Sequence, residues 1–125
     1  MKLGHENLLV YQQAIEFSAW AGALLDELPK GTSVRDQLER ASTSICLNIA
    51  EGAGRSTSKD QARFYDISRG SALECGACLD VIVARQLVAA DRIAEGKVLL
   101  RSVVSLLVRL IQSGDNNRMY EEFAE

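Results

Sequence analysis

The sequence predicts an all-α protein, a four-helix bundle, on three observations. Apolar residues recur at alternating spacings of three and four over most of the chain, as they do on the buried side of a packed helix. No stretch alternates apolar and polar residues over the length of a useful strand. Proline, which interrupts helices, occurs once, as Pro29. The 125 residues suit a single domain, residues 1–125, and the 47% of them that are hydrophobic suffice for its core.

The first helix is predicted over residues 8–28. Its seam has the spacing of a bundle helix and consists of Val10, Ala14, Phe17, Ala21, Leu24 and Leu28. A second stripe widens the buried face and consists of Ile15, Ser18, Gly22 and Leu25. Two stripes indicate a helix with more than one neighbour, and Pro29 ends it.

The second helix is predicted over residues 34–52, with Ser33 as its N-cap and Asp36 in its first turn. Its apolar face consists of Val34, Leu38, Ala41, Ile45 and Ile49, and the helix runs to about Gly52. The glycines at 52 and 54 favour a helix end there and a loop after it.

The third helix is predicted over residues 59–89, because Ser58 and Gln61 have the spacing of a capping box. We assign to its apolar side Phe64, Ile67, Ser71, Cys78, Val81, Ile82 and Leu87. Gly70 and Gly76 each weaken a helix interior by about 1 kcal/mol relative to alanine. Their presence predicts that a neighbouring backbone comes close at these positions.

The fourth helix is predicted over residues 97–113, with a tail over residues 114–125 after the stop signal at Gly114. Apolar residues form two stripes, Leu99, Val103, Leu106 and Leu110, and Val104, Val108 and Ile111. A helix that is apolar around so much of its girth is typical of a central position or of burial in an assembly.

Charge and cysteine content narrow the class of protein. The net charge is −3, which excludes a bulk basic attraction to nucleic acid, although residues 30–114 carry twelve basic and nine acidic groups. Three cysteines, an odd number, argue against a disulfide framework. The N-terminus is too polar for a secretory signal, and no apolar run approaches the roughly 20 residues of a membrane span. We therefore expect a cytoplasmic protein that does not enter a membrane.

Polar residues interrupt the apolar pattern of the second and third helices. On the second helix, Ser44, Asn48 and Glu51 share one side, and Ser71 and Glu74 follow on the third. A buried polar group without a partner costs about 1–3 kcal/mol, so these five residues are predicted to face inward and satisfy one another. They form either a structural polar layer that fixes helix register or a functional polar site.

These residues also carry a resemblance to a known family. The sequence contains Asn48-Ile49-Ala50-Glu51-Gly52 followed by Arg55, and Gly70-Ser71-x-x-Glu74 on the third helix. Further matches are Leu9-Val10-Tyr11-Gln12-Gln13-Ala14 and Leu28-Pro29. Over nearly its whole length the chain resembles the four-helix-bundle family of proteins encoded in 23S rRNA intervening sequences. It is also similar to the accessory variability protein of diversity-generating retroelements.

The resemblance implies an up-down-up-down bundle and a homopentameric ring. For the retroelement protein it implies action without catalysis, by binding nucleic acid and a reverse transcriptase through basic surfaces. Here the candidate basic set is Arg55, Lys59, Arg63 and Arg69. Asp60 and Asp66 lie among these residues, so the alternative is a solvated face of internal salt bridges.

Metal and redox sites find little support. A di-iron bundle needs two Glu-x-x-His motifs, and the only histidine is His5. Cys75 and Cys78 form a Cys-x-x-Cys motif, but it lies inside a helix with no preceding strand. Zinc would need four ligands, which Cys46 and His5 complete only with strain. We predict that these cysteines pack in the core and that the protein holds no cofactor.

Three functional hypotheses follow. The first is a non-catalytic, self-associating scaffold or accessory protein with itself, or another protein, as partner. The second is RNA or DNA binding through the basic face of a homo-oligomeric ring. The third is an enzyme that uses Glu51 and Glu74, or Cys75 and Cys78, and it is the least favoured because nothing in the sequence indicates a pocket around them.

Overall fold

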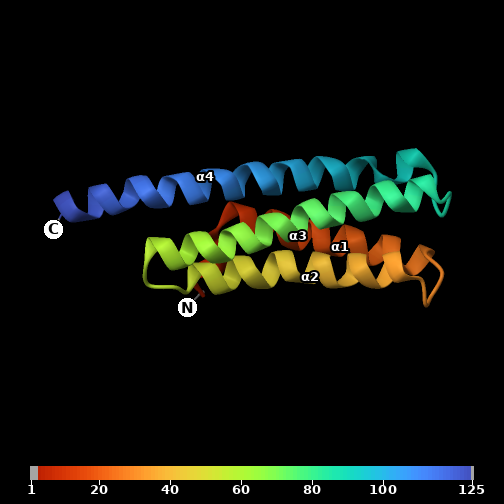
Figure 1. Ribbon diagram of the computed structural model, residues 1–125, viewed down its shortest axis with the longest axis horizontal. Helices are drawn as coiled ribbons and strands as arrows, with labels where there is room; N and C mark the ends of the chain where they lie inside the picture. The colour runs from red at the N-terminus through yellow and green to blue at the C-terminus, as the bar shows by residue number, and fades with distance from the viewer. Residues whose placement is uncertain (1–2, 125) are drawn as a thin grey trace.

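Four long helices pack side by side along one axis (Figure 1). The computed structural model describes the backbone of residues 3–124 and the side chains of residues 3–114. The helices are α1 (Leu9–Glu27), α2 (Ser33–Ala53), α3 (Ser58–Ala84) and α4 (Ala94–Ala124), with short 3-10 turns η1 (Gly4–Asn7) and η2 (Ala90–Ile93). Successive helices run in opposite directions, and each long helix contacts two others, α2 with α1 and α3, and α4 with α3 and α1. The predicted antiparallel four-helix bundle is confirmed.

The seam of α1 and the apolar face of α2 were predicted correctly, but the second stripe of α1 was not. All six residues of the α1 seam and all five residues of the α2 face are buried, whereas Ile15 of the second stripe is 44% exposed. Phe17, Leu38 and Ile45 are completely inaccessible to solvent. Regular spacing sufficed here because each helix carries its large apolar residues mainly on one side.

The predicted apolar side of α3 was only partly correct: Cys78 and Ile82 are buried, whereas Phe64, Ile67, Ser71 and Val81 each lie one residue, about 100°, before a buried position. The buried positions are Tyr65, Ser68, Ala72, Cys75, Cys78, Leu79 and Ile82. Ile67 and Val81, which we had placed inside, are 46% and 37% exposed. The prediction failed because α3 has apolar residues on its outer side as well, so hydrophobic spacing alone does not choose between the two sides.

Helix α3 also ends earlier than predicted, at Ala84 instead of residue 89. Gln86 has φ of +60°, in the left-handed region, which ends the helix. The N–H of Gln86 donates to the carbonyl of Val83, and the N–H of Leu87 donates to that of Ile82. These two bonds form a Schellman motif, in which glycine is the usual residue at the left-handed position.

Because glycine adopts a positive φ without strain, Gln86→Gly is expected to raise the free energy of unfolding by about 0.5–1 kcal/mol. Chemical denaturation of the variant and the parent protein measures the change. Gln86→Ala is the matched control, since alanine keeps the Cβ that causes the strain, and it should bring no gain. Equal gains from both substitutions would contradict this account.

Two predicted helix starts are shifted by one residue. The N-cap of α2 is Thr32, not Ser33, and its hydroxyl donates to the carbonyl of Pro29. The N-cap of α3 is Thr57, whose Oγ1 accepts a bond from the N–H of Asp60. The predicted capping box at Ser58 is therefore wrong, and the neighbouring threonine does the capping.

The predicted stop at Gly114 was wrong, because α4 continues to Ala124. Gly114 lies beside the first residue of α3, where a Cβ placed on the glycine would be 3.8 Å from that of Ser58. Beyond this level α4 projects past the rest of the bundle (Figure 1). A glycine weakens a helix by about 1 kcal/mol but does not block it as proline does. None of the helices the structure describes carries a stretch long and apolar enough to cross a membrane.

Close helix contacts occur at other glycines than those predicted. A Cβ placed on Gly70 or Gly76 would meet nothing within 4 Å. On Gly52 it would lie 2.8 Å from the ring of Tyr65, and on Gly96 it would lie 2.3 Å from the ring of Trp20. Gly52 and Gly96 thus let α2 approach α3 and α4 approach α1, whereas Gly70 and Gly76 face open space.

Candidate functional site

Three of the five predicted polar residues meet between α2 and α3. The hydroxyls of Ser44 and Ser71 are 2.8 Å apart and hydrogen-bonded. Asn48 donates from Nδ2 to the hydroxyl of Ser44 at 3.0 Å and to its carbonyl at 2.9 Å. All three side chains are half-buried. One hydrogen bond of this cluster, between Ser44 and Ser71, joins the two helices, and the bonds of Asn48 hold Ser44 within α2.

The two glutamates do not belong to this cluster. We expected Glu51 and Glu74 to face inward, and both are exposed in the protomer. Glu51 forms an ion pair with Arg55 in the turn that follows α2, and Glu74 accepts a long bond of 3.4 Å from Gln37. Their position follows from the orientation of the helices: the carboxylates remain hydrated, which avoids the cost of burying charge.

Sequence reasoning missed the most deeply buried polar contact of this interface. Ser68 is completely inaccessible, and its hydroxyl donates to the carbonyl of Ile45 at 2.8 Å. The signal was present in the spacing of Ser68 to Ala72, Cys75 and Leu79, which is as regular as the α1 seam. It was overlooked because the outer side of α3 competed with it.

The contact between Ser44 and Ser71 is expected to couple the two helices by about 0.5–1.5 kcal/mol, as a typical intramolecular hydrogen bond does. A double-mutant cycle with Ser44→Ala, Ser71→Ala and the double variant measures this coupling from the three unfolding free energies. A cycle between Ser44 and the exposed Thr43, whose hydroxyl bonds to its own helix, is the control and should show no coupling. No coupling in the first cycle would contradict the contact.

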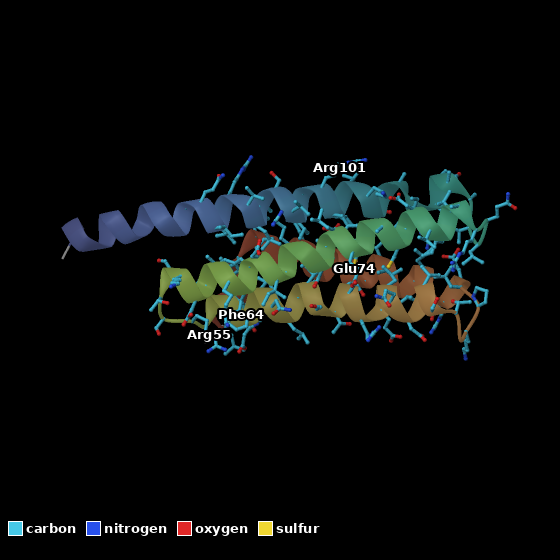
Figure 2. All side chains as sticks on the ribbon, in the orientation of Figure 1. Arg55, Phe64, Glu74 and Arg101 are labelled. Atoms are coloured by element: carbon cyan, nitrogen blue, oxygen red, sulfur yellow. The ribbon has the colours of Figure 1, made fainter. Side chains whose placement is uncertain are left out.

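Three of the four predicted basic residues, Arg55, Lys59 and Arg63, lie in or soon after the turn between α2 and α3, where Figure 2 places Arg55 and Phe64. The guanidinium carbons of Arg55 and Arg63 lie 4.6 and 4.9 Å from the centre of the Phe64 ring. Two cations on one aromatic ring form a compact positive surface. Arg55 is also paired with Glu51, so part of this charge is neutralised within the protein.

The other two predicted basic residues, Arg69 and Lys59, differ in whether an ion pair neutralises their charge. Arg69 pairs with Asp66 one turn earlier at 2.9 Å, as the salt-bridge alternative predicted. Lys59 is exposed in the first turn of α3, next to Asp60. The set therefore divides into two internally paired arginines and two cations, Lys59 and Arg63, without an ion pair among the described side chains.

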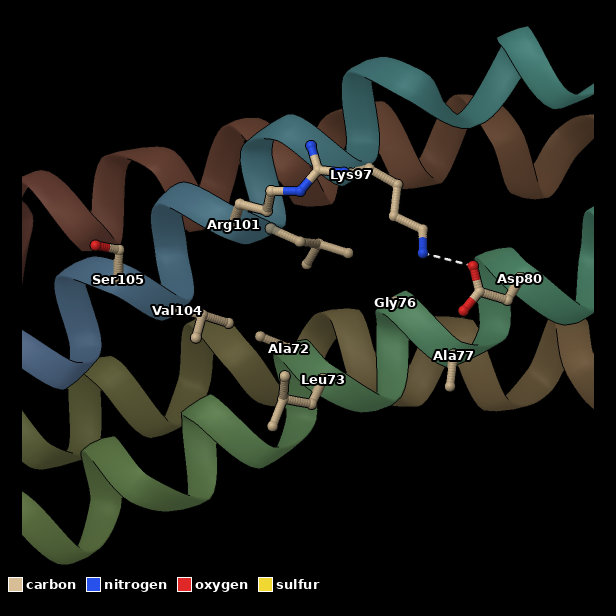
Figure 3. Close-up of a pocket in the computed structure, with 10 residues that line it drawn as sticks. Ala72, Leu73, Gly76, Ala77, Asp80, Lys97, Arg101, Val104 and Ser105 are labelled. Atoms are coloured by element: carbon tan, nitrogen blue, oxygen red, sulfur yellow. Dashed lines mark hydrogen bonds and ion pairs between the residues drawn. The ribbon is translucent and has the colours of Figure 1, made fainter.

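An open groove runs between α3 and α4 (Figure 3). It has a volume of about 530 Å³, and Leu73, Gly76 and Ala77 of α3 line one side of it. On the other side lie Leu100, Val104, Lys97 and Arg101 of α4. Lys97 forms an ion pair with Asp80 across the groove, whereas Arg101 has no ion pair among the described side chains. The groove is thus mainly apolar and carries one uncompensated cation.

A family model of 23S rRNA-intervening sequence proteins matches residues 6–109, from within η1 to the middle of α4. The chain belongs to this family. The resemblance read from the sequence is therefore confirmed, and the matched region contains both the polar cluster and the groove. The further likeness to retroelement accessory proteins stays a prediction.

A solved structure supports the fold of this family member. It is the crystal structure of a protein with unknown function from the S23 ribosomal protein family of Bacteroides thetaiotaomicron VPI-5482. The two superpose with a TM-score of 0.78 at 21% sequence identity, over 82% of this chain and 98% of the other. At this identity the likeness shows a shared fold. A search of curated proteins gave no match.

The cysteines of this family member lie in the core. Cys46, Cys75 and Cys78 are free thiols with at most 7% exposure. Burial raises the pKa of all three thiols, most strongly that of Cys75. A redox nucleophile needs the opposite shift. No cluster of three or more metal-ligating side chains occurs among the described residues.

The raised pKa of Cys75 predicts a loss of stability at alkaline pH. Above about pH 8.5 the thiol ionises in the unfolded chain but stays protonated in the folded protein. The unfolded state then holds fewer protons, so stability falls as pH rises, by about 1.4 kcal/mol per pH unit for each such thiol. Between pH 8 and 10, Cys75→Ala should reduce the total loss by about 2 kcal/mol. Denaturation curves at both pH values measure it, and an unchanged pH dependence would contradict the assignment.

Proposed function

We propose that this protein acts by binding instead of catalysis and that it assembles with copies of itself as a scaffold or accessory protein. The observation that carries the proposal is the outer side of α3. There Ile67, Leu73 and Val81 are 46%, 53% and 37% exposed, and Leu73 lines the apolar groove. Exposed apolar residues on the outer side of a helix, one of them lining a groove, are typical of an interaction surface.

The chemistry of the remaining residues supports a non-catalytic role. Glu51 and Glu74 bind separate partners on the surface and share no enclosed pocket. The thiols of Cys75 and Cys78 are buried, and burial favours their unreactive protonated form. Neither pair of candidate residues therefore lends support to the enzyme hypothesis.

Multi-angle light scattering on a sizing column tests the assembly. At micromolar concentration we expect a mass that is a multiple of 13.7 kDa. The family resemblance implies five copies. A stable monomer at that concentration would refute the proposal of self-association.

A second candidate function is RNA or DNA binding at the α2–α3 turn. It is favoured by the two guanidinium groups on the Phe64 ring and by the nearby cation Lys59. Arginine at an aromatic surface can contact phosphates and stack on bases. In a ring, each copy would add one such positive surface, which would compensate for the small charge of a single surface.

Fluorescence anisotropy with labelled RNA and DNA tests this function. Affinity is expected to fall steeply as salt rises, because phosphate contacts release counterions. The triple variant Arg55→Glu, Lys59→Glu and Arg63→Glu should abolish binding. Arg85→Glu, which changes an exposed arginine at the opposite end of α3, is the control and should preserve it. No binding at low salt, or equal loss in both variants, would refute it.

A further inference from the structure

The outward side of α1 carries negative charge and small side chains, and it therefore complements the groove between α3 and α4. Gln12, Glu16, Ala19 and Ala23 are exposed there, and Ile15 is 44% exposed. From Leu9 to Glu27 the helix contains three carboxylates and no lysine or arginine. Next to Glu16 on this side are Gln12, Ile15 and Ala19, and the small side chains of Ala19 and Ala23 let another helix approach closely.

The groove has the complementary properties. Between Gly96 and Gly114, α4 contains Lys97, Arg101 and Arg109 and no acidic residue. Asp80 already pairs with Lys97, which leaves Arg101 as the cation available to an incoming carboxylate. On the α3 side of the groove, Gly76 has no side chain and Ala77 has only a methyl group. A Cβ placed on Gly76 would meet nothing within 4 Å. The groove can therefore bind a helix on an apolar surface, and the groove has a cation, Arg101, at its edge.

The two surfaces also lie at the same height along the bundle. The hydroxyl of Ser102 donates to Oε1 of Gln13, so these two residues are level. Trp20 is level with Gly96, because its ring lies where a Cβ of that glycine would be. Glu16 lies between Gln13 and Trp20 on α1, and Arg101 lies between Ser102 and Gly96 on the antiparallel α4. At about 1.5 Å per residue, Glu16 is about 4.5 Å above the level of Gln13 and Arg101 about 1.5 Å above that of Ser102, so the two residues differ in height by only about 3 Å, on different sides of the protomer.

Equal height matters because of symmetry. Rotation about an axis parallel to the bundle moves a protomer sideways without raising or lowering it, so residues that are level in one copy stay level between copies. Helix α1 contacts α2 and α4, whereas the groove opens between α3 and α4, so the two surfaces belong to different sides. A contact between different surfaces joins copies head to tail, and such contacts close into a ring when the rotation permits.

We infer that the outward side of α1 from one copy binds in the α3/α4 groove of the next copy, with Glu16 paired to Arg101. The occupant of the groove is then a second copy of this chain, and the inference rests on the proposed self-association. Ile15 and Ala19 of the incoming helix cover Leu73 and Ala77, which removes apolar surface from water at the centre of the contact. The ion pair fixes the register and excludes a reversed orientation.

Charge reversal tests the contact. Glu16→Arg and Arg101→Glu each place like charges against each other at every interface and should weaken assembly by about 100-fold or more. The double variant Glu16→Arg with Arg101→Glu recreates the pair in reverse and should regain assembly. Glu39→Arg, an exposed reversal on α2, is the matched control and should assemble as the parent protein does. Sedimentation velocity over a concentration series measures all five proteins, and circular dichroism verifies that each is helical.

The outcomes separate the two proposals. Dissociation of both single variants and recovery in the double variant would establish the contact. An assembled parent protein with unaffected single variants would overturn this interface and leave the proposed assembly intact. Single variants that dissociate without recovery in the double variant would overturn the direct pairing of Glu16 with Arg101. A monomeric parent protein would overturn both the interface and the assembly.

Discussion

Replacement of Phe17 by alanine lowers the free energy of unfolding by about 3–5 kcal/mol, the largest effect we expect from one substitution. The Phe17 side chain is completely inaccessible, and its ring lies 5.6 Å from that of Trp20. Truncation removes this contact and leaves a cavity that well-packed neighbours fill only in part. Chemical denaturation at a fixed protein concentration measures the loss.

Val98→Ala is the control for this experiment. Val98 is 60% exposed in the first turns of α4, and its truncation should change stability by less than about 0.5 kcal/mol. A comparable loss in both variants would mean that Phe17 does not occupy the core as described. Because assembly contributes to apparent stability, both variants must be compared at the same concentration.

The second large effect is expected at Gly96, where Gly96→Ala should destabilise the protein by about 1–3 kcal/mol. Alanine is the better helix former, so propensity alone would predict a gain. The added Cβ would lie 2.3 Å from two ring atoms of Trp20. That ring is held by Phe17 on α1 and by the guanidinium of Arg92, 5.5 Å from its centre, so it cannot move without disturbing other contacts.

Gly70→Ala is the matched substitution for this second prediction. Gly70 is also inside a helix, but a Cβ there meets nothing within 4 Å, so alanine should raise the free energy of unfolding by about 0.5–1 kcal/mol. The fluorescence of Trp20, the single tryptophan, should shift in Gly96→Ala and stay unchanged in Gly70→Ala. A stabilised Gly96→Ala variant would contradict the close contact.

Of the candidate site, the sequence identified the polar cluster but not its limits. Ser44, Asn48 and Ser71 could be found because polar residues in an apolar pattern need partners. Glu51 and Glu74 were assigned to the same cluster on spacing alone. A change of half a turn in helix orientation decides whether such a carboxylate is buried, and spacing does not determine orientation when a helix has two apolar sides.

The error on α3 is itself informative. Its outer residues Ile67 and Val81 were predicted to be buried because they have the spacing of a core stripe. In the protomer they are exposed, and they do not line the groove between α3 and α4. Their spacing matches that of a core stripe, but the packing of α3 turns these two residues away from the protomer core.

The sequence by itself determined the helical class, the four helices and the inward sides of α1 and α2, because these depend on local spacing and on residues with one apolar side. It also indicated the family, because the resemblance rests mainly on two short motifs, residues 48–52 and residues 70–74. Only the tertiary structure decided the orientation of α3, the close contacts at Gly52 and Gly96, and the similar heights of Glu16 and Arg101 along the bundle. These features depend on how helices pack against one another, and packing joins residues too distant in the chain for any local pattern to relate.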